Sequence, residues 1–167
     1  LKELNLGNDD EQDESPELEK EDYNRITELK IINSLTSLER LDLSYNFYLG
    51  ELRPKIDQLK SLKVLNLHYC FRLLSLTPNI GNLAELEELD LGGFNGYIEE
   101  LPESIGDLQN LQTLNIENFT ELKALPESIG NLTSLRKLNF WGCESLKSFP
   151  KKIENLKNLK DLGISSQ

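Results

Sequence analysis

Leucine spacing divides the chain into repeats of nearly constant length. The intervals between successive L-x-x-L-x-L motifs are 37, 24, 24, 25, 24 and 24 residues. The seven motifs begin at Leu1, Leu38, Leu62, Leu86, Leu111, Leu135 and Leu159. Inside the fifth motif, Leu114 and Ile116 alternate with polar residues, which predicts a short strand with one buried face. A fixed period in this range indicates stacked repeats instead of a single compact globule.

The second half of each repeat predicts an irregular or briefly helical return path. In the fifth repeat, Pro126 lies near its start, and the apolar residues are mostly three or four positions apart. They are Leu122, Leu125, Ile129 and Leu132. Because no repeat can cover its own leucines, we expect neighbouring repeats to stack in register, with their strands in one parallel sheet on the inner wall.

The full repeat, L-x-x-L-x-L-x-x-N/C-x-x-L-x-x-L-P-x-x-I-x-x-L, resembles the leucine-rich-repeat family. The stretch LPESIGNLTSLRKLNFWGCESLKSFP, at 125–150, is similar to the intracellular repeats of plant immune receptors and to related bacterial repeat proteins. The G-x-I-P wording of the plant extracellular class is not matched. The resemblance implies an α/β solenoid, a horseshoe segment with a parallel β-sheet on its concave face and irregular or short helical convex segments. It also implies a concave face that binds proteins, but it names no partner.

We expect one domain over residues 1–167, with an insertion at 8–25 that lengthens the first interval. The chain starts and ends within a repeat, so we expect it to be a segment of a longer protein. Hydrophobic residues make up 38% of it, and no apolar run approaches the roughly 18 residues of a membrane helix. The resemblance implies a cytoplasmic protein, intracellular or delivered into a host cytosol, although an extracellular surface location stays open.

Most of the negative charge is local. Residues 8–22 hold nine carboxylates and one lysine, a formal charge of −8 out of −11 for the chain. Such a run predicts a solvated surface loop, and a docking site for a basic partner is the alternative. Nucleic acid is not expected as a partner, because an acidic surface without a basic stripe repels a polyanion.

Position nine of each repeat, counted from the first leucine of the motif, faces inward. Cys70 and Cys143 hold this position three repeats apart, a separation of about 14 Å at the usual strand spacing, so we expect two free, buried thiols. Phe94 and Phe119 hold it in the fourth and fifth repeats, and we expect them to pack inward as an aromatic spine. Gly92 opens the segment GGFNGY, which predicts a bulged turn and not a phosphate site.

No catalytic, metal or cofactor site is expected. The chain has one histidine, and a zinc site needs about four converging ligands. No serine, cysteine or carboxylate lies in a recognisable nucleophile motif, so we expect a protein that is not an enzyme.

Residues that point away from the core carry the functional prediction. Position five is nearly uniform, which favours hydrogen bonding along a column over ligand contact: Asn5, Asp42, Asn66, Asp90, Asn115, Asn139, and then Gly163. Tyr45, Tyr69 and Trp141, at positions seven and eight, are expected to be exposed aromatics of the type that anchors protein interfaces. The predicted partner-binding residues of the concave face are Arg40, Tyr45, His68, Tyr69, Glu88, Glu117, Lys137 and Trp141. The alternative is that these aromatics only shield the sheet.

Two functions compete on this basis. The first is the ligand-sensing part of an intracellular, immune-type receptor. The second is the substrate-recognition domain of a bacterial effector or surface protein, tethered to an enzyme domain outside this sequence. An oligomerisation module is a third hypothesis, and the sequence leaves the oligomeric state open.

Overall fold

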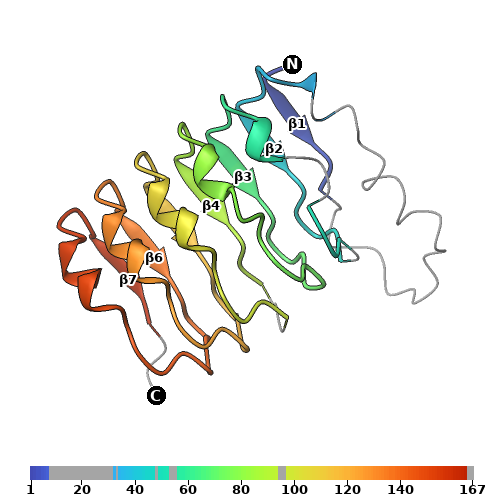
Figure 1. The fold of residues 1–167 in the computed structure, drawn as a ribbon. Coiled ribbons are helices and arrows are strands. Elements are labelled where there is room, and N and C mark those ends of the chain that lie inside the picture. Colours follow the sequence, from blue (N-terminus) through green and yellow to red (C-terminus); the bar gives the residue numbers. More distant parts are fainter. Residues whose placement is uncertain (8–31, 33, 48, 53–55, 94–96, 165–167) are drawn as a thin grey trace.

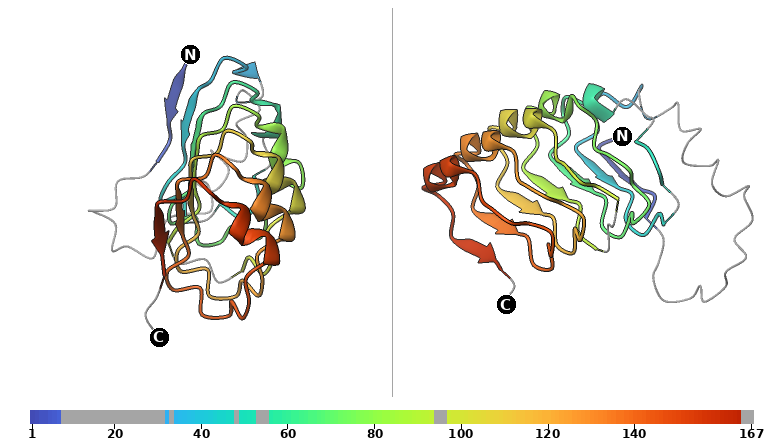
Figure 2. Two further views of the ribbon diagram at one scale, coloured as in Figure 1. Left: turned by 90° about the vertical axis from the view of Figure 1, so that its left-hand side faces the viewer. Right: turned by 60° about the horizontal axis from the view of Figure 1, so that its bottom comes forward.

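The computed structural model describes residues 1–7, 32, 34–47, 49–52, 56–93 and 97–164. Over these residues the chain is a stack of similar coils with strands on one side and 3-10 helices on the opposite side (Figure 1, Figure 2). The acidic insertion and Phe94 lie outside the described residues.

The strands form one open parallel sheet in chain order, β1 to β7. Their bounds are β1 Glu3–Asn5, β2 Arg40–Asp42, β3 Val64–Asn66, β4 Glu88–Asp90, β5 Thr113–Asn115, β6 Lys137–Asn139 and β7 Asp161–Gly163. Each strand covers positions three to five of its repeat, and each pairs position by position with the next, as Leu89 does with Leu114. The predicted register is therefore confirmed, although the strands span three residues each and not the six of the whole motif.

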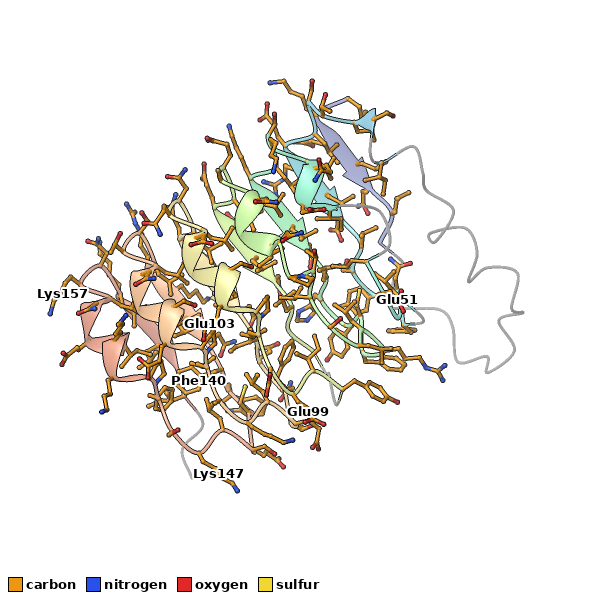
Figure 3. The ribbon with its side chains drawn as sticks, in the orientation of Figure 1. Glu51, Glu99, Glu103, Phe140, Lys147 and Lys157 are labelled. Carbon is orange, nitrogen blue, oxygen red and sulfur yellow. The ribbon has the colours of Figure 1, made fainter. Side chains whose placement is uncertain are left out.

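Short 3-10 helices form the return path on the convex side. They are η2 Ile56–Gln58, η3 Ile80–Asn82, η4 Glu103–Asp107, η5 Glu127–Asn131 and η6 Lys151–Asn155. Pro102, Pro126 and Pro150 hold the N-cap position of the last three, where a missing amide hydrogen costs nothing because that amide has no partner within the helix. Charged side chains such as Glu103 and Lys157 cover this outer side (Figure 3).

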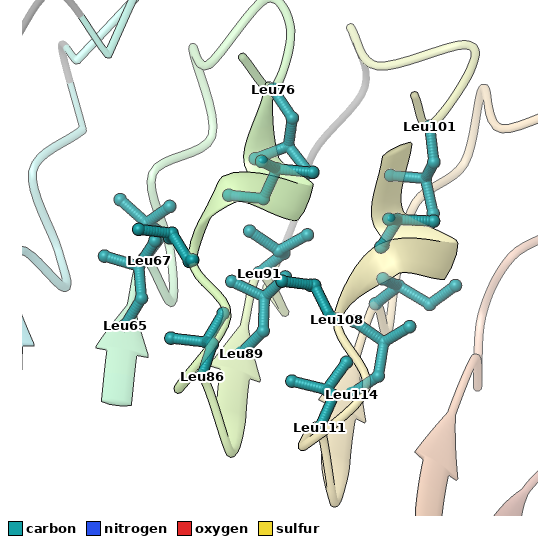
Figure 4. Packing of buried hydrophobic residues seen from close by; sticks show 14 of the residues in the cluster. Leu65, Leu67, Leu76, Leu86, Leu89, Leu91, Leu101, Leu108, Leu111 and Leu114 are labelled. Atoms are coloured by element: carbon teal, nitrogen blue, oxygen red, sulfur yellow. The ribbon is translucent and has the colours of Figure 1, made fainter. Parts of the chain in front are cut away.

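A ladder of leucine and isoleucine side chains fills the space between the two sides (Figure 4). Leu114 and Ile116 are fully buried, whereas Thr113 and Asn115 are half-buried, so the alternation predicted for the strand is confirmed. Phe119 is also fully buried, as predicted for position nine.

The structure corrects one prediction about the thiols. Both cysteines are free, and Cys70 is buried, but Cys143 is only half-buried. Cys143 lies in the sixth repeat, where fewer described coils pack against it. Each thiol donates a hydrogen bond to a strand-end carbonyl of the preceding repeat, Cys70 Sγ to Leu43 O at 3.2 Å and Cys143 Sγ to Ile116 O at 3.1 Å. Burial raises the pKa of Cys70 to about 12 and that of Cys143 to about 11, so both remain neutral thiols at physiological pH.

Candidate functional site

The sheet has no layer of the described chain on its concave side, and that face carries a groove of about 320 Å³. The groove crosses β1 to β5 and is lined by the side chains at positions three and five. These are Glu3, Asn5, Arg40, Asp42, Val64, Asn66, Glu88, Asp90, Thr113 and Asn115. Arg40 and Glu88 are the predicted site residues that lie in it.

Position five ends each strand by the same side-chain turn. In the first six repeats the Oδ1 atom of the Asn or Asp accepts a hydrogen bond from the backbone amide two residues later, for instance Asp42 Oδ1 from Ser44 N at 2.8 Å. Asn and Asp have the length and polarity that close this turn well, which accounts for the uniform column. The seventh repeat has Gly163 there and lacks this device.

The predicted hydrogen bonds along the column are present in part. Asn66 Nδ2 donates to Asp42 Oδ2 at 3.1 Å, and Asn115 Nδ2 donates to Asp90 Oδ1 at 3.0 Å. In the sixth repeat, Asn139 Nδ2 donates instead to Glu117 Oε2 at 2.7 Å. Position five is therefore chiefly structural, and Glu117 supports a neighbouring turn.

The residue at position eight has a positive φ in repeats two to six. The values are 59° for Tyr45, 57° for Tyr69, 96° for Gly93, 59° for Asn118 and 74° for Gly142. Tyrosine rarely adopts this left-handed conformation, which crowds Cβ against the carbonyl oxygen. It persists here because the adjoining Asx turn and the sheet ladder fix the backbone: Tyr45 N donates to His68 O and Tyr69 N to Gly92 O, both at 2.8 Å.

The left-handed turns bring aromatic rings together at the carboxyl ends of β2 and β3. The rings of Tyr45 and Tyr69 stack with centroids 5.2 Å apart, and His68 meets the edge of Tyr69 at 4.8 Å. These distances place the three side chains in contact with one another. The two tyrosines are half-buried and not fully exposed, however, because each ring covers the other.

A second aromatic row lies beside the first and was missed by the sequence reasoning. Phe47 and Phe71 stack with centroids 5.3 Å apart, and Phe47 also meets the edge of Tyr45 at 6.3 Å. Both occupy position ten, 24 residues apart like the tyrosines, so the repeated spacing is the signal that could have identified them. We call Tyr45, Phe47, His68, Tyr69 and Phe71 the aromatic cluster.

His68 joins the aromatic cluster to the groove. Its Nδ1 donates to Asp90 Oδ1 at 3.1 Å. That hydrogen bond raises the pKa of His68 above its ordinary value, the charges of Asp90 and Glu117 act in the same direction, and partial burial acts against them.

The remaining predicted residues lie apart from this group. Trp141 follows β6, three strands from β3, and its side chain is 53% exposed. Lys137 is also exposed and lies 3.6 Å from a carboxylate oxygen of Asp161. The structure therefore divides the predicted binding residues into three groups. Arg40 and Glu88 line the groove, and Tyr45, His68 and Tyr69 belong to the aromatic cluster. The others, Glu117, Lys137 and Trp141, belong to repeats five and six.

The described residues contain no group of three His, Cys, Asp or Glu side chains placed to hold a metal ion. Nor does any helix in the described part have the length and apolar character needed to cross a bilayer.

Comparisons with known proteins agree with this architecture. The model of the family "Leucine-rich repeat region" matches residues 49–167. A comparison with curated proteins finds no match.

Solved structures with the same architecture come from bacteria and plants. The leucine-rich repeat domain of the type III effector XopL is 27% identical with a TM-score of 0.66, over 81% of this chain and 56% of that one. The ectodomain of the plant membrane receptor kinase GASSHO1/SCHENGEN3 from Arabidopsis thaliana, solved with CASPARIAN STRIP INTEGRITY FACTOR 2, is 29% identical with a TM-score of 0.63, over 81% and 16%. A leucine-rich repeat protein of Leptospira interrogans is 28% identical with a TM-score of 0.50, over 79% and 50%. The chain thus spans less than two thirds of each of these structures. By the family match over most of its length and by its seven-stranded parallel solenoid, this chain belongs to the leucine-rich-repeat family.

Proposed function

We propose that this chain is a recognition module that binds a protein partner on its concave face. The observation that carries the proposal is the groove of about 320 Å³ on a sheet face that no layer of the described chain covers, with the aromatic cluster beside it at the carboxyl ends of β2 and β3. A groove bordered by rigid aromatic side chains offers apolar area at low entropic cost, which is the usual composition of an interface anchor. The plant receptor described above was solved with a factor bound, which supports the use of this fold for protein or peptide ligands.

The finer role that we propose is ligand sensing in an intracellular, immune-type receptor. The resemblance of residues 125–150 to such repeats supports it, and with it a cytoplasmic location and a module without catalytic activity of its own. The similarity to the XopL domain supports the second candidate, a substrate-recognition domain of a bacterial effector. Sequencing the parent gene separates them: a nucleotide-binding domain on the same chain favours the receptor, and a secretion signal or an enzyme domain favours the effector.

The test of concave-face binding compares two matched variants. In the first, Tyr45 and Tyr69 are changed to Asn, which tolerates a positive φ, and Trp141 is changed to Ala. In the second, three exposed residues away from the concave face, Glu85, Asp107 and Lys157, are changed to Gln, Asn and Gln. A partner isolated by cross-linking to the wild-type protein is purified, and its affinity for each protein is measured by calorimetry.

We expect the concave variant to bind at least tenfold more weakly, because truncating an aromatic anchor commonly costs about 2 kcal/mol of binding free energy. The control variant should match the wild type. Unchanged affinity in the concave variant, with thermal unfolding showing that it is folded, contradicts the proposal.

A further inference from the structure

The groove on the concave face carries an excess of negative charge. Its lining contains four carboxylates against the single cation of Arg40, a formal net charge of −3. The other side chains of the lining are amides, one threonine and apolar groups, which bring no compensating charge. The four carboxylates are those of Glu3, Asp42, Glu88 and Asp90.

Two of these carboxylates have oxygen atoms that accept no hydrogen bond from the described residues. The side chain of Glu88 is exposed and forms no ion pair or hydrogen bond within the described part of the chain. The hydrogen bonds to Asp90 all end on Oδ1, so its Oδ2 has no partner among the described residues. By contrast, the carboxylate of Glu39 at position two is already paired within the chain. It lies 2.7 Å from the Lys2 ammonium and 3.5 Å from the Lys63 ammonium.

The shape of the groove suits an extended chain. It crosses five parallel strands, a length of about 19 Å at the usual strand spacing, which an extended segment of roughly six residues spans. An acidic floor over that length complements a segment with several cationic side chains.

The aromatic cluster adds an independent preference for cations at the same place. The faces of aromatic rings carry a negative potential that attracts ammonium and guanidinium groups, and of the two faces of each tyrosine only one is stacked on the other tyrosine. Because His68 contacts both the Tyr69 ring and Asp90 Oδ1, these rings lie beside the acidic lining. Carboxylates and ring faces thus select the same class of ligand.

We infer that the groove binds an extended, basic segment of a protein partner, whose Lys or Arg side chains pair with Glu88 and Asp90 and extend toward Tyr45 and Tyr69. The inference rests on the proposed function, because it names the chemistry of the partner for the same face. An Arg side chain fits best, since its fork pairs with a carboxylate through two parallel hydrogen bonds and its plane stacks on a phenol ring.

The experiment uses the whole chain and a fluorescent synthetic peptide that alternates glycine with arginine and lysine, measured by anisotropy. The same peptide with glutamine in place of every cation is the ligand control. The test variant is Glu88→Gln with Asp90→Asn, which removes two charges while the amide oxygen at residue 90 still closes the turn onto Gly92. Glu85→Gln with Asp107→Asn removes two exposed charges elsewhere and is the matched control.

The basic peptide should bind the wild type, and the groove variant should bind it roughly tenfold more weakly, with the control pair within about twofold of the wild type. Glu88→Lys alone, at an exposed strand position that tolerates change, should weaken binding further. Affinity should fall as salt rises, because the partners are of opposite charge.

Three results with the synthetic peptides overturn the inference. They are equal binding of the glutamine peptide, equal loss in the groove and control pairs, and a groove variant that binds like the wild type. Either of the last two results would mean that the basic peptide is attracted by the overall charge of the chain, including the acidic insertion, and not by the groove. A natural partner that depends on the concave face but is not displaced by the basic peptide also overturns it and leaves the proposed function intact. A partner indifferent to the concave face removes the proposed function itself.

Discussion

At the scale of single residues, the least expected feature is a tyrosine in the left-handed conformation. Tyr45 and Tyr69 adopt it at position eight, where other repeats have Gly93, Asn118 and Gly142. Sequence patterns signal this conformation through glycine and asparagine, and the second and third repeats carry neither at that position. The turn was therefore not predicted at the two repeats where it matters most for the aromatic cluster.

This conformation predicts an unusual order of stability among variants of Tyr69. Tyr69→Ala and Tyr69→Gly both lose the ring contacts, but alanine keeps the cost of positive φ and glycine removes it. The glycine variant should therefore be more stable by about 1 kcal/mol. Urea unfolding of both proteins checks this order. At Leu114, which is extended and buried, glycine should instead be the less stable of the two.

Gly93 shows the converse constraint. A Cβ at this residue would lie 2.8 Å from the backbone nitrogen of Tyr69 and 3.0 Å from its Cγ, and φ is 96°. The glycine at residue 93 is thus explained by its close contact with Tyr69, which the sequence alone did not show.

At the scale of elements, the ends of neighbouring strands are coupled by side chains. The bond from His68 to Asp90 joins the end of β3 to the end of β4, and it is strongest when His68 is protonated. Since the folded protein raises the pKa of His68, the ion pair stabilises the fold fully below the ordinary histidine pKa of about 6.5. That contribution is lost as pH rises through the higher pKa of the folded state.

Removing the imidazole of His68 should therefore reduce the pH dependence of the free energy of unfolding. The stability difference between wild type and His68→Gln should be larger at pH 5 than at pH 8, by an amount on the order of 1 kcal/mol or less because the site is partly exposed to solvent. Chemical unfolding at a series of pH values measures it. A difference that is constant over this range would show that the pair with Asp90 has no energetic weight.

The convex helices pack closely where they contain glycine. A Cβ on Gly130 in η5 would collide with the Cβ and carbonyl oxygen of Lys152 in η6. Gly130→Ala should therefore destabilise the protein by about 1–3 kcal/mol. Gly50 is the control, since its nearest outside atom, the Arg72 oxygen, would be 3.9 Å from a new Cβ. Gly50→Ala should change the melting temperature little, and similar losses in both variants would rule out helix contact as the cause.

At the scale of the whole molecule, the leucine spacing predicted the fold because each repeat performs the same structural task. Strand register, the buried ladder and the return path all follow from residues such as Leu114 and Ile129, whose burial depends only on adjacent repeats. The candidate site was predicted less completely. Its aromatic cluster depends on backbone conformation and on ring packing between repeats. Trp141 lies three strands along the sheet from β3, with β4 and β5 between them.

The stack should also be least stable at its ends within this chain. The central leucine is half-buried in β1 and exposed in β7, whereas it is fully buried in β3 and β5. Hydrogen exchange should therefore be slow at Leu65 and Leu114 and fast at Leu162, because terminal repeats lose contacts on one side. Uniform protection along the stack would indicate a single cooperative unit.

The shared strand-end turn has a consequence for how this surface can change. Since the side chain at position five closes the turn in each of these repeats, the backbone at position eight keeps a positive φ whether that residue is Tyr, Asn or Gly. The contact surface can therefore be rewritten most freely at position seven, where Ser44, His68, Glu117 and Trp141 follow the same turn, whereas position eight must keep a residue that tolerates a positive φ. Selection in nature, or a designed library at position seven, can explore new ligands while the turn that displays them is kept.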